Sequence, residues 1–150
     1  MQDGFGFNVI MSTRPQTIAY GLHDSPVGQL AWVVEKFKEW SDPASDLPED
    51  AFSRDRILTD VSTQWFTGTS GSIAQSYYDV DHDPEGWGPK ERVDVPTAFV
   101  VTPGDVTIRR FAERDTTVAR WTEFDKGGAY VALEQPGMLI QDVREFFADL

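Results

Sequence analysis

Cysteine is absent from the 150 residues of this sequence. The absence excludes disulfide bonds, thiolate metal sites and cysteine nucleophiles within these residues. Proteins without disulfides are typical of reducing compartments, so we expect a cytoplasmic location. The chain is long enough to bury roughly 70% of the surface that its unfolded form exposes, so a stable fold need not depend on covalent staples.

Basic residues are scarce. Thirteen Lys and Arg face twenty-five Asp and Glu, which gives a formal net charge of −12. Binding to phosphate backbones or anionic membrane surfaces needs clustered positive charge, so neither nucleic acid nor a membrane is an expected partner. Apolar runs are also short of the roughly 18 residues that a membrane span needs, and the stretch "MQDGFGFNVI" has no basic leader region.

Histidine is rare as well, and the two that are present, His23 and His82, lie far apart without ligand spacing to a partner. The alternating aspartates of "DVDHD" resemble a calcium loop, but that loop would need Gly in place of Pro84 and an acidic residue in place of Lys90. We therefore expect no metal and no cofactor. Glycine-rich phosphate loops and a G-x-S-x-G elbow are missing too, so spacing and composition alone identify no enzyme.

The first half of the sequence has helical patterns. Ser25 and Pro26 form a typical N-cap and first helical residue, followed by apolar residues at helical spacing as far as "KEW". Ser53 is expected to cap a second helix, which "TGTSGS" interrupts before "IAQSYY". The polar stretch "DVDHDPEGWGPKERVD", residues 79–94, is predicted to be a long loop and the domain boundary.

The second half alternates between strand and helix patterns. "PTAFVVTP" and "TTVARWTEF" are predicted strands, separated by the helical "VTIRRFAE". After Pro136, one predicted helical face comprises Leu139, Val143, Phe146, Phe147 and Leu150. This order predicts a parallel sheet. Because two parallel strands do not form a self-sufficient sheet, we expect the sequence to be the end of a longer fold. The open edge of the sheet also predicts self-association.

The stretch "DKGGAYVALEQP", residues 125–136, has the form of a catalytic turn. Two glycines follow the second predicted strand, and Ala129 occupies the next position, from which such a turn presents a side chain to a cleft. A methyl group at this position cannot take part in acid–base chemistry.

Three long segments resemble the C-terminal half of the microsomal-type epoxide hydrolases, in the α/β-hydrolase superfamily: "STRPQTIAYGLHDSPVGQLAWVVEKFKEW", "SRDRILTDVSTQWFTGTSGSIAQSYY" and "FDKGGAYVALEQPGMLIQDVREFF". The resemblance implies an α/β fold in which the last two parallel strands and flanking helices of the hydrolase core follow a mostly helical cap. It places the cap at residues 1–79, a polar linker at 80–94 and the core segment at 95–150. The nucleophile elbow and the oxyanion-hole loop would precede Met1.

In that family an Asp attacks the epoxide, a His activates water against the resulting ester, a carboxylate orients the His, and two cap tyrosines donate to the epoxide oxygen. The resemblance places the orienting acid at Asp105 and one donor at Tyr77, with Tyr78 as the alternative. The second donor position is Phe7, which has no hydroxyl, and the position of the His is Ala129. Phe7, Trp65 and Tyr78 are implied as substrate contacts.

Three hypotheses follow. The first is a truncated epoxide hydrolase that is inactive alone, and its implied ligand class is a small hydrophobic epoxide-like molecule. The second is a pseudoenzyme that keeps an apolar pocket for a hydrophobic ligand. The ten Phe and five Trp are side chains of the kind that line such pockets. The third is a subunit whose missing strands come from another polypeptide or a second copy.

Overall fold

The computed structural model describes residues 3–85, 91–148 and 150, and the chain divides into two compact units. The first unit comprises Met1–Glu39 and Ser53–Pro89, and the second comprises Trp40–Phe52 and Lys90–Leu150. No helix within the described residues is both long enough and apolar enough to cross a bilayer. The predicted division at residues 80–94 into cap and core stays a prediction.

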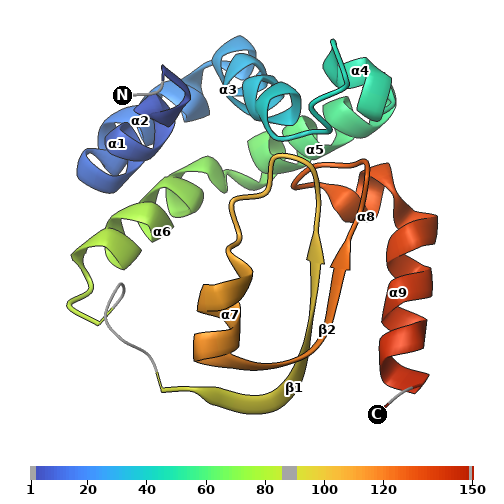
Figure 1. Ribbon diagram of the computed structural model, residues 1–150. Helices are drawn as coiled ribbons and strands as arrows, with labels where there is room; N and C mark the ends of the chain where they lie inside the picture. Colours follow the sequence, from blue (N-terminus) through green and yellow to red (C-terminus); the bar gives the residue numbers. More distant parts are fainter. Residues whose placement is uncertain (1–2, 86–90, 149) are drawn as a thin grey trace. The chain divides into compact units, whose positions relative to one another are not determined.

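The first unit is helical (Figure 1). Its elements are η1 (Asp3–Phe5), α1 (Gly6–Thr13), α2 (Pro15–Asp24), α3 (Pro26–Glu39), α5 (Arg54–Thr67) and α6 (Ser70–His82).

The predicted helix starts are confirmed. The Ser25 hydroxyl accepts a hydrogen bond from Gly28 N at 3.0 Å, and the Ser53 hydroxyl accepts one from Arg56 N at 3.2 Å. Each serine thereby satisfies one of the amides that the first turn of a helix leaves without a partner. The predicted interruption is also present, since Gly68 ends α5 in the left-handed conformation, with φ of 65°.

A buried glutamine joins three helices of this unit. Gln29 of α3 is 1% exposed, accepts a hydrogen bond from the Ser70 hydroxyl at 2.6 Å and donates one to Gln64 at 3.2 Å. Buried polar groups are costly unless they are paired, so this chain of bonds fixes α3, α5 and α6 relative to one another. The buried apolar residues of this unit are Met11, Leu22, Phe37, Ile57, Val61 and Ala74.

The second unit contains a two-stranded parallel sheet with helices (Figure 1). Its elements are α4 (Pro48–Ala51), β1 (Val93–Val101), α7 (Arg109–Asp115), β2 (Thr116–Glu123), α8 (Val131–Glu134) and α9 (Pro136–Ala148). The predicted pair of parallel strands is confirmed, with Phe99 opposite Trp121 and Val101 opposite Glu123. Because the strands are parallel, the loops that follow them begin at the same edge of the sheet.

The predicted apolar face of α9 is partly wrong. Leu139 and Phe146 are half-buried, but Val143, Phe147 and Leu150 are 44%, 67% and 66% exposed. Asp142 is the buried residue of this helix, because its carboxylate accepts hydrogen bonds from Arg120 Nε at 2.8 Å and the Thr122 hydroxyl at 2.6 Å. An ion pair between β2 and α9 thus sets the orientation of the helix, which the apolar pattern alone did not predict.

The predicted loop at residues 79–94 is shorter than expected. Helix α6 continues through His82, and β1 begins at Val93. The extension of α6 is supported by a contact within its last turns, where the His82 ring stacks on Tyr78 with a centroid separation of 3.9 Å. Residues 86–90 of the predicted linker, which include Lys90, lie outside the described residues.

Candidate functional site

The loops that follow β1 and β2 are joined by Thr102. Its backbone carbonyl accepts a hydrogen bond from Asp105 N at 3.0 Å, and its hydroxyl donates one to Gly128 O at 3.2 Å. Thr102 is 8% exposed, and its hydroxyl bond to Gly128 is buried. One buried residue therefore ties the segment of the predicted acid, Asp105, to the turn that carries Ala129.

The Asp105 side chain is exposed and stabilises its own loop. Its Oδ1 atom accepts a hydrogen bond from Thr107 N at 2.7 Å, immediately after Gly104 turns the chain with φ of 85°. This Asx-type turn is a common local use of aspartate. The carboxylate lies at the carboxyl end of β1, but the bond shown here is to the loop backbone and not to the Ala129 turn.

The turn of residues 127–129 is held by its backbone amides. Gly127 N donates to Asp42 Oδ2 at 2.7 Å, Gly128 N donates to Glu134 Oε1 at 3.0 Å, and Ala129 N donates to Trp40 O at 2.7 Å. Successive amides that face acceptors form a small concave anion site. Here, carboxylates of the chain itself fill two of the three positions.

Both glycines are required by this arrangement. Gly127 has φ of 94°, which side-chain-bearing residues rarely adopt. A Cβ atom on Gly128 would lie 2.3 Å from Trp40 O, well inside van der Waals contact. Ala129 follows in an exposed position. The backbone of the predicted catalytic turn is thus fully supported, while its tip carries a methyl group.

Asp42 is the charged support of this turn. Its carboxylate accepts hydrogen bonds from Gly127 N and from Ala44 N, at 2.7 and 2.9 Å, and these bonds hold its pKa below the ordinary value. The amide of Asp42 in turn donates to Glu134 Oε2 at 2.8 Å. Asp42 therefore bonds Gly127 directly, and Glu134 links the Asp42 amide to the Gly128 amide.

In the first unit, the two predicted donor positions lie together. The Phe7 ring of α1 and the Tyr77 ring of α6 make an edge-to-face contact, with centroids 5.9 Å apart and planes at 83°. Both side chains are half-buried. The structure therefore brings a tyrosine hydroxyl and a ring without one into a single aromatic pair.

The other predicted contacts lie apart from this pair. The Tyr78 ring stacks on His82 of its own helix, whereas the Trp65 ring stacks on His23 with centroids 6.2 Å apart. Of the two tyrosines that the sequence left open, Tyr77 is the one whose ring contacts Phe7. The choice between Tyr77 and Tyr78 as the donor stays a prediction.

Several residues around these positions were not predicted. Asp42 and Glu134 hold the turn, and Lys36 lies beside Phe7. Asp42 precedes Pro43 in a polar stretch that indicates only a loop, and Glu134 has no local signal. Lys36 is 7% exposed, which is rare for lysine and has no sequence signature.

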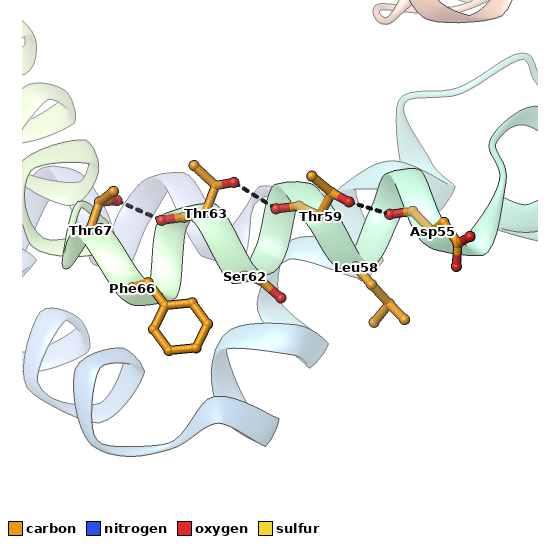
Figure 2. Close-up of a pocket in the computed structure, with 7 residues that line it drawn as sticks. All are labelled: Asp55, Leu58, Thr59, Ser62, Thr63, Phe66 and Thr67. Carbon is orange, nitrogen blue, oxygen red and sulfur yellow. Dashed lines mark hydrogen bonds between the residues drawn. The ribbon is translucent and has the colours of Figure 1, made fainter.

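A separate open groove of about 660 Å³ runs along one face of α5 (Figure 2). The hydroxyls of Thr59, Thr63 and Thr67 in this groove each donate to the backbone carbonyl four residues earlier, as the dashed lines show. None of the predicted site residues lines the groove. Across the described part of the chain, no group of three or more His, Asp or Glu side chains could hold a metal.

The close approach at Gly128 makes a testable prediction. Gly128→Ala should lower the free energy of unfolding by roughly 3 kcal/mol, because the added methyl group must displace the backbone at Trp40. Gly137→Ala is the matched control, since a Cβ there meets nothing within 4 Å and helix propensity favours it by about 1 kcal/mol. Urea unfolding of both variants measures the difference, and equal midpoints would contradict the packing described.

The lowered pKa of Asp42 predicts a pH dependence. A carboxylate with a depressed folded-state pKa stabilises the fold above its unfolded value, about 3.9, and the effect is lost as pH falls through the folded value. Asp42→Asn should therefore lower the melting temperature at pH 7, and the gap to the unchanged chain should close below about pH 4. Asp125→Asn, at an exposed position in the loop after β2, is the control and should show no such gap. A gap for Asp42→Asn that persists at pH 2 would overturn the assignment.

Comparison with known proteins agrees with the resemblance seen in the sequence. The chain is 37% identical, over 98% of its length, to a Stigmatella aurantiaca protein provisionally named an epoxide hydrolase, and 32% identical, over 94%, to epoxide hydrolase 1 of Sus scrofa. It covers 33% of each, so the chain spans about a third of the length of these curated relatives. No family model matches the chain.

Solved structures give the same result. The epoxide hydrolase of Aspergillus niger, as an enantioselective mutant, superimposes with a TM-score of 0.81 at 27% identity, covering 100% of this chain and 38% of the other. Juvenile hormone epoxide hydrolase from Bombyx mori has the same fold, with a TM-score of 0.84 over 97% of this chain and 39% of its own. The chain is thus a homologue of the carboxyl-terminal portion of the epoxide hydrolases and has the corresponding part of the α/β-hydrolase fold.

Proposed function

We propose that this chain carries the donor and turn segments of an epoxide hydrolase site in a form that cannot complete hydrolysis alone. In this proposal Tyr77 donates a hydrogen bond to an epoxide oxygen, Asp105 occupies the position of the orienting acid, and Ala129 occupies the position of the base. The observation that carries the proposal is Ala129 itself, exposed at the tip of a turn whose three amides are all bonded.

The chemistry explains why this position decides the outcome. Opening an epoxide by a carboxylate gives an ester, and hydrolysis of that ester needs a base that removes a proton from water. A methyl group cannot do this, and Asp105 in the proposed role acts only through a histidine. The family's nucleophile motif also has no match within these 150 residues, so the first step would require residues from elsewhere.

The donor side is reduced as well. An alkoxide leaving group needs hydrogen-bond donors, and loss of one such donor costs about 10²–10³ in rate. Phe7 keeps the ring and lacks the hydroxyl, so Tyr77 would act alone in this pair. The aromatic character of the pair supports a small hydrophobic epoxide as the ligand class.

A second candidate function is favoured by the sheet. Within the described residues, the sheet has the two strands β1 and β2. Large apolar side chains are exposed on β1, such as Val95 at 67%, and on α9, such as Phe147 at 67%. The similar solved structures are more than twice as long as this chain. We propose that the sheet is completed by further strands, supplied by another polypeptide or another copy.

Turnover by the purified chain tests the first candidate. With styrene oxide as the probe, no diol should form above the uncatalysed rate, and Ala129→His should not restore it, because no nucleophile is matched within these residues. Sedimentation velocity on the same sample distinguishes a monomer from a self-completed assembly. Diol formation that Asp105→Asn or Tyr77→Phe abolishes, while Tyr20→Phe at an exposed position leaves it unchanged, would contradict the proposal.

A further inference from the structure

Lys36 of α3 is a buried cation. The residue is 7% exposed, and its ammonium group forms ion pairs of 2.6 Å with both Glu35 and Glu39. A buried charge is tolerated only when it is paired and well bonded. The two glutamates thus hold the ammonium group at a defined point beside α1. An exposed lysine without such partners would instead sample many rotamers.

That ammonium group also lies over an aromatic ring. Lys36 Nζ is 4.5 Å from the centroid of the Phe7 ring, within the range of a cation–π interaction. Such contacts strengthen when water is excluded, as the burial of Lys36 indicates here. The Phe7 ring therefore binds the ammonium group through its π face, and this interaction needs no hydroxyl.

The same ring is the neighbour of Tyr77. Phe7 and Tyr77 meet edge to face at 5.9 Å and 83°, the arrangement that aromatic quadrupoles favour. Lys36 thus contacts Phe7, and Phe7 contacts Tyr77. Three helices take part, since Lys36 belongs to α3, Phe7 to α1 and Tyr77 to α6.

We propose that Lys36 is a positioning residue, which fixes the Tyr77 ring through a cation–π contact with Phe7. This inference rests on the proposed function for its meaning, because it assigns the geometry of the candidate epoxide-oxygen donor to a residue outside the reacting groups. The effect of Lys36 on the Tyr77 ring can be measured without any epoxide turnover.

The test is aromatic NMR of the full 150-residue chain with labelled tyrosine rings, in which Tyr77→Phe assigns the Tyr77 signals. Phe7→Leu defines the ring shifts that Tyr77 has without its partner. Lys36→Met, which keeps the length and apolar stem, should move the Tyr77 signals most of the way to those of Phe7→Leu. Lys36→Arg should retain the original shifts, because a guanidinium also stacks on aromatic rings. Lys38→Met, on the exposed side of the same helix, is the matched control.

A second measurement needs no substitution and covers the case in which Lys36→Met does not fold. In the unchanged chain, the ε-methylene protons of Lys36 should be shifted upfield by the Phe7 ring and should show a nuclear Overhauser contact to its protons. Absence of both signals, or Tyr77 shifts that are the same in Lys36→Met as in the unchanged chain, overturns the proposal. These NMR signals do not depend on epoxide turnover. Diol formation tests the proposed function and the NMR signals test the role of Lys36, so the failure of one is distinguishable from the failure of the other.

Discussion

The hydrogen bonds from the amides of residues 127–129 to Asp42, Glu134 and the Trp40 carbonyl are the constraint on which the second unit depends. The bonds to Asp42 and Trp40 join the loop after β2 to a segment about 85 residues earlier in the chain. Because Gly128 has no Cβ, the two backbones approach each other more closely than any other residue would permit. Thr102 adds the loop after β1 to this assembly. The position of Ala129 is therefore fixed by backbone contacts that do not involve its own side chain.

In the proposed function, this separation would let the turn keep its shape without a base at position 129. None of the bonds that shape the turn uses the side chain at position 129, so a methyl group there leaves the turn intact. The first unit shows a parallel case, because the Phe7 ring keeps its contacts with Tyr77 and Lys36 although it has no hydroxyl. In both units, the scaffold around a candidate catalytic position is maintained by groups other than the one that would do the chemistry.

Local rules predicted much of the fold. The caps at Ser25 and Ser53 and the two parallel strands depend on neighbouring residues, and the sequence shows them directly. The orientation of α9 was not predictable from its apolar pattern, since Asp142 is buried by a partner 22 residues away on β2. Asp42, Glu134 and Lys36 were missed for the same reason. Their importance comes from long-range contacts, and polar residues in loops or on helices carry no periodic signal.

Amide hydrogen exchange at residues 127–129 tests the central claim most directly. The account predicts that these three amides exchange at least about 100-fold more slowly than unprotected amides, because exchange requires the turn to open. Their protection should approach that of the paired amides of β1 and β2. Exchange at unprotected rates, while the strand amides remain protected, would show that the turn is not held by Asp42, Glu134 and Trp40, and would contradict the account.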